Sequence, residues 1–354
     1  MRYTKIAALF IAAVLILLSV SSCGGNNGTP ETSAPDATAP VTDTGAPETE
    51  QPEIKLFEYK TAAGGAVITT CRLLAEEIEV PSEIDGISVI GIGEKVFLGI
   101  DELETVVVPE GVLMIGDSAF ENCRNLKNVT LPSTLSSVGA RAFRETPWYE
   151  SLDDEFTVVG DGVLIKYSGE SPEVVLPDGI GYLTDAFENR DDITSVAVSD
   201  GVRTIGSYAF SGMDALEKIE IPQSVRVIGS SAFSACRALR EITIPEGVES
   251  IGEFLFSRCV ALEKAALETK STYLPKGTFI HCGALKEVVL PEGLTEIGVS
   301  AFEDCPSLET VNLPESLTKI ADSAFDEGTP VTCRVSPGSY AESFCTRLGI
   351  NFTN

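Results

Sequence analysis

The sequence contains one histidine, one tryptophan and three methionines, and its 25 lysines and arginines face 53 aspartates and glutamates. The only histidine, His281, falls beside a recurring cysteine position, so no Ser–His–Asp triad, Cys–His pair or multi-histidine metal site is predicted. No glycine-rich loop of the kind that cradles nucleotide phosphates is present. The acidic residues fall on surface positions of a repeated segment, which indicates no cleft for paired-carboxylate chemistry. These absences predict a protein that is not an enzyme, without catalytic residues, metal or cofactor.

Basic residues are scarce enough to limit the partners of the chain. The formal net charge is −28, and loss of Arg2 and Lys5 with a signal peptide would leave −30. Nucleic-acid binding depends on neutralising phosphates, so no nucleic-acid partner is expected. Docking on anionic lipid is disfavoured for the same reason. Solubility on a crowded surface is sufficient to explain the charge.

Long apolar runs are also rare, and the one near the N-terminus predicts export. Residues 6–18 follow a positively charged start and are too few to span a bilayer stably, which predicts a signal peptide over residues 1–22. The segment before Cys23 resembles a bacterial lipobox, in which Cys23 would be acylated and become the mature N-terminus. A plain signal peptide with an incidental cysteine is the alternative. Two acyl chains would suffice for stable anchoring.

Residues 23–53 predict a lipidated cysteine followed by a disordered tether. The segment after Cys23 is rich in proline, threonine, alanine and glycine, and its acidic residues are accompanied by no lysine or arginine. Such a composition buries too little surface to order itself. Prolines and self-repulsion would keep the tether extended, which would hold the folded part away from the membrane.

A phenylalanine recurs every 23 residues through most of the remaining chain. The series comprises Phe97, Phe120 and Phe143, and then Phe187, Phe210, Phe233, Phe256, Phe279, Phe302 and Phe325. Only the step from Phe143 to Phe187 differs, at 44 residues. A fixed period of this length is the signature of a solenoid, in which stacked units share one continuous core.

Within one repeat, apolar residues recur at fixed positions counted from the phenylalanine. In the repeat of Phe233 they are Leu239 (+6), Ile242 (+9), Ile244 (+11), Val248 (+15) and Ile251 (+18). The alternation at +9 and +11 predicts a short strand. A proline at +12 ends this strand, and a glycine at +19 permits a corner. The segment that precedes each phenylalanine is long enough for about one helical turn.

These positions resemble the BspA-like family of bacterial leucine-rich repeats. Two runs match its pattern directly, namely Leu308, Val311, Leu313 and Pro314, and Ile297, Gly298, Ala301, Phe302 and Cys305. The match covers about residues 75–330, lacks the asparagine ladder of ordinary leucine-rich repeats, and has one degenerate copy with Glu268, Ser271 and Leu274-Pro275 at conserved columns of the pattern. The resemblance implies a surface-exposed protein that binds host or neighbouring-cell macromolecules.

The predicted fold is a leucine-rich-repeat β-solenoid of about ten 23-residue units with short helical turns. Residues 54–96 would form an N-terminal cap with a hairpin of residues 57–60 and 66–71, followed by a first half-repeat. The repeats would occupy residues 97–330. Residues 331–354 would form a C-terminal cap, with a last strand at 331–335 and a helix at 340–348 between Ser339 and Gly349.

Residues 144–183 interrupt the repeat and contain the only tryptophan, Trp148. A second hairpin of residues 157–159 and 163–167 is predicted, with a resumed strand at 174–176. The stretch is interpreted either as a structural variant of the repeat or as a binding insertion. In the second interpretation Trp148 and Tyr149 are the candidate contact residues.

Five of the nine cysteines share position +3, namely Cys123, Cys236, Cys259, Cys282 and Cys305. Stacked identical positions project in parallel, which suits poorly the torsion of a disulfide. A reduced, buried column is therefore predicted. Cys333 and Cys345 are better candidates for a disulfide, and Cys71 has no obvious partner.

If +9 and +11 face the core, then +8 and +10 face outward and form an extended recognition surface. The candidate ligand-binding residues on it are Lys218, Glu220, Glu241, Thr243, Lys264, Ala266, Glu287 and Val289. A merely solvated surface is the alternative interpretation.

The predicted function is protein–protein binding by an exported, lipid-anchored protein on the extracellular face of the cell membrane. Adhesion or recognition of a host or neighbouring cell is the first hypothesis, with an extracellular protein or glycoprotein as partner. A non-enzymatic envelope scaffold is the second hypothesis. A glycan-binding surface lipoprotein is the third, although it would need an exposed aromatic platform that the outward positions lack.

Overall fold

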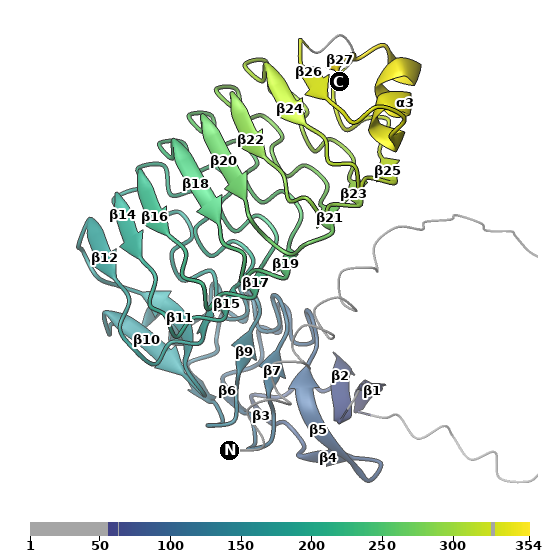
Figure 1. Ribbon diagram of the computed structural model, residues 1–354. Helices are drawn as coiled ribbons and strands as arrows, with labels where there is room; N and C mark the ends of the chain where they lie inside the picture. The colour runs from purple at the N-terminus through teal and green to yellow at the C-terminus, as the bar shows by residue number, and fades with distance from the viewer. Residues whose placement is uncertain (1–55, 63, 327–329) are drawn as a thin grey trace, which may run out of the picture.

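The computed structural model describes residues 56–62, 64–326 and 330–354, so the predicted signal peptide, Cys23 and tether lie outside the described residues. The described chain forms a β-solenoid of about 12 turns, each of roughly 23 residues (Figure 1). The predicted fold class is therefore confirmed, with more turns than the ten counted from the phenylalanines. Among the described residues, no helix is both long enough and apolar enough to cross a membrane.

Each turn contributes strands to two lateral rows. The first row comprises β3 (Glu77–Glu79), β6 (Thr105–Val107), β8 (Asn128–Thr130), β12 (Glu173–Val175), β14 (Ser195–Ala197), β16 (Lys218–Glu220), β18 (Glu241–Ile244), β20 (Lys264–Leu267), β22 (Glu287–Val289), β24 (Thr310–Asn312) and β26 (Thr332–Arg334). The second row comprises β5 (Ile87–Ile92), β7 (Met114–Ile115), β9 (Ser137–Val138), β13 (Tyr182–Leu183), β15 (Thr204–Ile205), β17 (Val227–Ile228), β19 (Ser250–Ile251), β21 (Tyr273–Leu274), β23 (Glu296–Ile297) and β25 (Lys319–Ile320).

Neighbouring strands of a row run parallel because the chain returns to the same place once per repeat. Ile242 pairs with Ala265 and Ala265 with Val288, so equivalent positions lie opposite one another. Ile242 and Ile244 are buried, whereas Glu241 and Thr243 are exposed. The predicted alternation along the first row is thus confirmed, and the register places every residue type in a column.

The segment around each phenylalanine is a pair of turns rather than the expected helical turn. In the repeat of Phe233, Ser231 and Ala235 both have a positive φ, near 55° and 58°. This alternation points the N–H groups of Ser231, Phe233 and Ala235 in one direction, and they donate to carbonyls of the next turn at 2.8, 3.1 and 2.7 Å. Bonds between turns therefore replace the bonds within a helix.

Phenylalanines and cysteines form the two predicted columns. Successive rings from Phe187 to Phe325 stack with centroids 5.0–5.7 Å apart. Each thiol at +3 donates to the carbonyl of the phenylalanine 26 residues earlier, as Cys259 does to Phe233 at 3.0 Å. Similar bonds of 3.0–3.1 Å join Cys123, Cys236, Cys282 and Cys305 to Phe97, Phe210, Phe256 and Phe279. The predicted reduced, buried column is confirmed.

The two cysteines near the C-terminus are buried neighbours. Cys333 and Cys345 are free thiols, like the other described cysteines, so the structure does not contain the disulfide for which they were candidates. The pKa of the Cys333 thiol is raised above its usual range, chiefly by its interaction with Cys345. Both side chains fill space between the last turn and the C-terminal helix.

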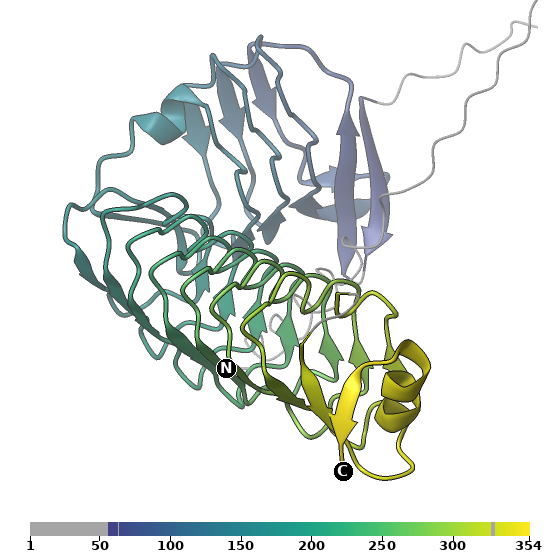
Figure 2. The ribbon, with the colours of Figure 1, turned by 90° about the horizontal axis from the view of Figure 1, so that it is seen from above.

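The core is divided into two clusters, rather than being continuous as the repeat alone predicts. The first stack ends at Phe143, whose ring is covered edge-on by Trp148 at 4.7 Å. The second stack begins with Phe156 and Tyr167, and the Tyr167 ring lies 5.0 Å from Phe187 in the phenylalanine column. The two stacks meet at an angle at this point (Figure 2). We refer to residues 141–192 as the joint.

The joint consists of a short helix and a hairpin. The helix α2 (Pro147–Glu150) was not predicted, and its N-cap is Thr146. The predicted hairpin is confirmed as β10 (Phe156–Val159) paired antiparallel with β11 (Val163–Tyr167). β11 then pairs in parallel with β13, so the hairpin opens the sheet of the second stack.

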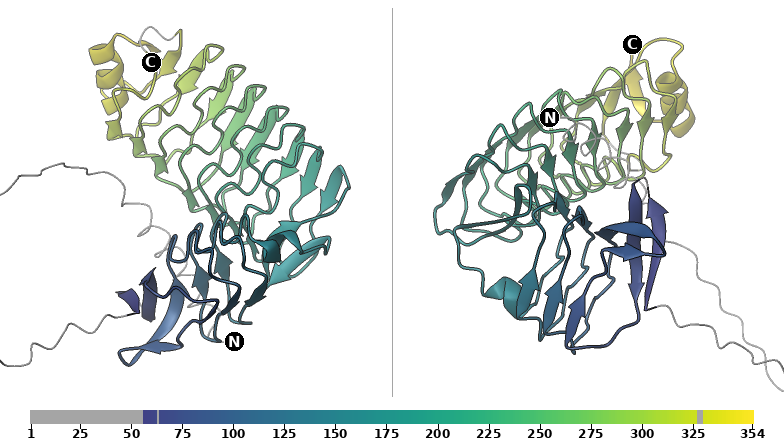
Figure 3. Two further views of the ribbon diagram at one scale, coloured as in Figure 1. Left: turned by 180° about the vertical axis from the view of Figure 1, so that it is seen from behind. Right: turned by 90° about the horizontal axis from the view of Figure 1, so that it is seen from below.

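The two ends of the described chain carry elements outside the repeat (Figure 3). β1 (Phe57–Ala62) and β2 (Gly65–Cys71) form the predicted hairpin, which continues into β5, and β5 also pairs with β4 (Glu83–Ile84). The predicted helix is α3 (Tyr340–Leu348), with Ser339 and Gly349 at its ends. The segment 331–335 is not the last strand, because β27 (Asn351–Thr353) follows α3 and pairs in parallel with β26.

Candidate functional site

The predicted recognition surface lies on the first row of strands in the second stack. We call the outward residues of β12 to β24 the strand face (Figure 1). Seven of the eight predicted residues are exposed, and the remaining one, Ala266, is half-buried. The parallel register brings Glu241, Lys264 and Glu287 side by side on consecutive strands. The structure therefore places the predicted residues on one surface, and whether they bind a ligand stays a prediction.

Charges on the strand face are largely paired with one another. Lys218 and Glu220 form an ion pair of 2.7 Å within β16, and the Lys218 hydrogen bond lowers the pKa of the Glu220 carboxyl. Lys264 and Glu287 form a pair of 2.9 Å between β20 and β22. These pairs are solvent-exposed and add little stability, so their charges remain available to a partner.

A line of charged residues at position +7 runs beside the strand face. Glu263 lies between Arg240 at 3.3 Å and Lys286 at 2.5 Å, and its pKa is lowered first by the Lys286 hydrogen bond. Opposite charges thus alternate along the axis of the stack with the spacing of the repeat. A partner with a matching alternation could exchange these bonds for its own.

Sequence reasoning missed one prominent residue of the strand face. Val175 in β12 is 73% exposed, the highest value among the large apolar side chains of the described chain. It stands in the same column as Ala197, Glu220, Thr243, Ala266 and Val289. The 44-residue step hid it, although the run of Val174, Leu176 and Pro177 carries the pattern of positions +9, +11 and +12.

The second predicted site, Trp148 and Tyr149, lies inside the joint. The Trp148 ring packs on Phe143, and the Tyr149 hydroxyl donates to the carbonyl of Ile165 at 3.0 Å. Burial raises the pKa of this hydroxyl. Both rings are half-buried and engaged by the protein. These contacts favour the structural variant of the repeat over the binding insertion.

A pocket of about 240 Å³ lies in the joint between the two stacks. Its main ionic contact is the Glu188 carboxylate, which pairs with Arg141 at 2.5 Å and with Arg144 at 3.0 Å. The Asp185 carboxylate accepts from the backbone N–H of Arg141 at 2.9 Å, where another repeat would offer a carbonyl. Burial raises the pKa of Asp185 to about 6. The charged groups that line the pocket are thus already engaged in bonds between the two stacks.

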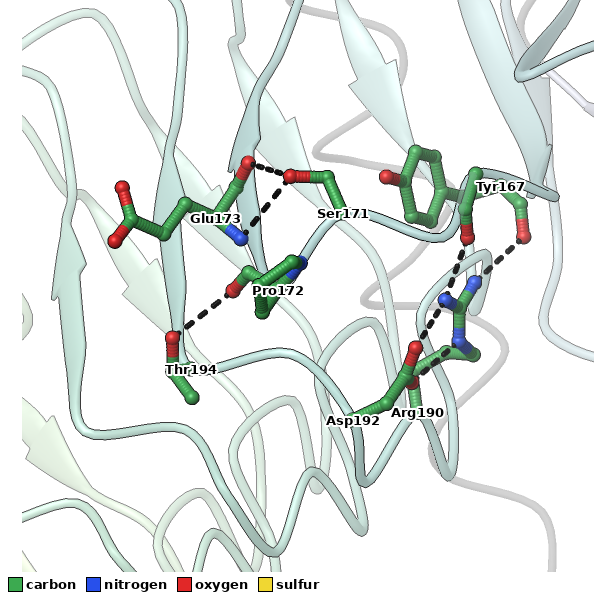
Figure 4. A network of polar contacts seen from close by, with 8 residues as sticks. Tyr167, Ser171, Pro172, Glu173, Arg190, Asp192 and Thr194 are labelled. Atoms are coloured by element: carbon green, nitrogen blue, oxygen red, sulfur yellow. Dashed lines mark hydrogen bonds and ion pairs between the residues drawn. The ribbon is translucent and has the colours of Figure 1, made fainter.

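Arg190 completes the joint by taking the place of a column cysteine (Figure 4). It stands three residues after Phe187, and its guanidinium donates to the carbonyls of Tyr167 at 3.2 Å and Gly169 at 2.7 Å. Asp192 holds it through two further bonds of 2.8 and 2.7 Å. Nearby, Thr194 donates to Pro172 at 3.0 Å, which fixes the entry into β12.

Several solved structures are similar to this chain. No curated protein matches the chain. A leucine-rich repeat protein from Bacteroides ovatus is 21% identical, with 85% of this chain and 98% of that chain covered and a TM-score of 0.39. A leucine rich cell surface protein from Faecalibacterium prausnitzii is 24% identical, with 84% and 97% covered and a TM-score of 0.35. The pneumococcal vaccine antigen PcpA is 15% identical, with 84% and 96% covered and a TM-score of 0.43.

A family model settles the classification. The model of the BspA type leucine rich repeat region matches residues 90–216 and 203–331, which together span more than half of the sequence. The matched residues include the phenylalanine and cysteine columns and most strands of both rows. The chain therefore belongs to the BspA-type leucine-rich repeat family.

Proposed function

We propose that this protein is a lipid-anchored cell-surface protein that binds an extracellular protein or glycoprotein through its strand face, in adhesion or in recognition of another cell. The observation that carries the proposal is the strand face itself, where small, apolar and mutually paired charged side chains are displayed on parallel strands. Such a surface offers a partner contacts at the regular spacing of neighbouring strands, about 4.8 Å. Solenoids use extended surfaces of this kind for binding.

The membrane link in this proposal comes from the sequence, because Cys23 lies outside the described residues. Acylation of Cys23 would retain the chain on the membrane, and the segment after it would separate the solenoid from the lipid. The structural neighbours named as a cell surface protein and a vaccine antigen are compatible with this location.

The test uses the full chain, purified with its lipid anchor in detergent, on an array of host matrix proteins, mucins and bacterial surface polymers at physiological salt. We expect saturable binding to a protein or glycoprotein. The variant Glu220→Lys, Glu241→Lys, Lys264→Glu should lose it, because it disrupts the charge order of the strand face. The matched control Glu253→Lys, Glu296→Lys, Lys319→Glu makes the same net charge change elsewhere, on β23 and β25 of the second row and just after β19, and should bind normally.

Circular dichroism of all variants controls for folding. Binding that survives the strand-face reversal would refute the assignment of the surface. Absence of binding to every spot, together with co-purification of the chain with envelope proteins, would favour a scaffold instead. Binding to glycans alone would favour the third hypothesis, for which the engaged rings of Trp148 and Tyr149 give no platform.

A further inference from the structure

One turn is missing from the row of turns that follows the strand face. In regular repeats the residues after the strand form a turn closed by a bond to the proline, such as Val248 N–H to Pro245 at 3.0 Å and Leu294 N–H to Pro291 at 3.0 Å. The degenerate copy has Glu268 instead of the proline, and its N–H donates to Ile244 of the preceding repeat at 2.9 Å. Lys270 N–H likewise donates to Val248 at 2.9 Å.

The segment 268–271 therefore lies flat against the preceding repeat. The Thr269 hydroxyl donates to the carbonyl of Val248 in the preceding repeat at 2.8 Å, and the Ser271 hydroxyl donates to the carbonyl of Tyr273 in the same copy at 2.8 Å. No equivalent turn stands between the flanking turns at 245–248 and 291–294. A hollow of about 500 Å³ results, and we call it the notch.

The notch has an apolar floor and an acidic rim. Its accessible apolar lining comes from Val289, which is also a residue of the strand face, and from Pro291, whereas Leu267 and Leu290 in its lining are buried. Three exposed carboxylates, Glu246, Glu268 and Glu292, line it as well. Lys270 is the one cation of the rim, 3.8 Å from Glu246, whereas Glu268 and Glu292 have no side-chain partner among the described residues.

We infer that the notch binds one lysine or arginine side chain of the protein ligand on the strand face. The inference rests on the proposed function, because it treats the notch as part of the same recognition surface. Lysine and arginine bury an aliphatic stem against apolar surface while their charged head stays in water. In the notch, the stem would lie on Val289 and Pro291, and the head would reach Glu268 and Glu292. A carboxylate ligand is disfavoured by the charge of the rim.

The chemistry of the notch can be tested without the natural ligand. The probe is an acetylated and amidated five-residue peptide of serine and threonine with one central lysine, titrated into the full chain in detergent. Methyl NMR reports on Leu267, Val289 and Leu290. We expect saturable shifts of these methyl signals, with a dissociation constant on the order of 1 mM for a single side chain. A norleucine peptide should bind about five-fold more weakly, and a glutamate peptide should produce no shifts.

Two variants distinguish specific binding in the notch from non-specific binding to the surface. The variant Glu268→Gln, Glu292→Gln should weaken lysine-peptide binding about five-fold, while the control Glu315→Gln changes the same turn position one repeat away and should have no effect. The variant Glu268→Pro, Thr269→Glu, Lys270→Gly, Ser271→Val copies the turn at 245–248 and should fill the notch. It should abolish the methyl shifts without loss of thermal stability. Unchanged binding by either notch variant would overturn the inference.

The failure of this inference is distinguishable from the failure of the proposed function. If the strand face binds a protein on the array and the filled-notch variant binds it equally well, the function stands and the notch has no role in it. If the lysine peptide binds in the notch but no protein binds the chain, the site is real and the proposed function is wrong. A ligand whose affinity falls at least ten-fold in the filled-notch variant would support both.

Discussion

Replacement of Asp185 by asparagine should stabilise the protein at neutral pH. The Asp185 carboxylate accepts from the backbone N–H of Arg141, and an asparagine amide oxygen can accept the same bond. Burial raises its pKa from 3.8 to about 6, so its ionised form is less favourable in the folded state than in the unfolded state. Stability from this group is fully present below pH 3.8 and is lost as the pH rises through about 6.

The size of the effect follows from the two pKa values of Asp185. A difference of about 2 units corresponds to a loss of about 3 kcal/mol at pH 7.5 and about 1 kcal/mol at pH 4.5. The Asp185→Asn variant does not titrate, so its advantage over the natural chain should grow by about 2 kcal/mol between these pH values. Other carboxylates titrate in the same range, but they cancel in the difference between the two proteins.

Urea unfolding followed by tryptophan fluorescence is the appropriate assay, because the single Trp148 lies in the joint beside Phe143. Asp192→Asn is a control of opposite sign, since the Arg190 hydrogen bond lowers the pKa of Asp192. That variant should lose stability as the pH rises, and only slightly because Asp192 is exposed. The reasoning about Asp185 is refuted if Asp185→Asn is less stable than the natural chain at pH 7.5 by a margin that increases with pH.

Three further predictions concern the columns, the joint and the anchor. Cys259→Ala should cost about 0.5–1.5 kcal/mol, because the buried Phe233 carbonyl loses the thiol bond and keeps only the 3.4 Å bond from the Cys236 N–H, whereas Cys259→Ser should cost less; thermal unfolding by circular dichroism would show whether the two differ. Glu188→Gln should destabilise the joint by about 1–2 kcal/mol, since two partly exposed arginines lose their shared counter-ion, and the loss should be detected by Trp148 fluorescence before the far end of the second stack unfolds. If instead the joint and the far end of the second stack unfold together, the joint is not an independent weak point. Cys23→Ala should abolish incorporation of an alkyne-labelled fatty acid into the chain in a bacterial host, and labelling that persists would contradict the proposed anchor.

The repeat was readable from the sequence because each column is occupied by one residue type at a constant interval. The phenylalanine and cysteine columns, the strand at +8 to +11 and the outward positions all follow from that interval. The helix at 340–348 was also predictable, since Ser339 and Gly349 are local signals for its ends. The segment around each phenylalanine is not a helical turn, because residues with positive φ such as Ser231 and Ala235 interrupt it and direct N–H groups to the next turn.

Only the hairpin of the joint was predictable, because the other contacts of the joint connect residues that share no pattern. Tyr167 enters the phenylalanine column out of phase, and Arg190 replaces a cysteine by donating to the same kind of carbonyl. The notch is a similar case. The degenerate copy was recognisable in the amino-acid sequence, but only the bonds of Glu268 and Lys270 to the preceding repeat show that a turn is missing.

The sequence by itself determined the solenoid, its period and which side chains face outward, since a repeated pattern must repeat its burial. Only the tertiary structure decided where the stack divides, which outward charges are paired and where the regular surface is hollow. These properties depend on contacts between neighbouring turns. The residues of a column can be identified from the sequence one at a time, whereas a hollow or an ion pair depends on how two neighbouring turns lie against each other.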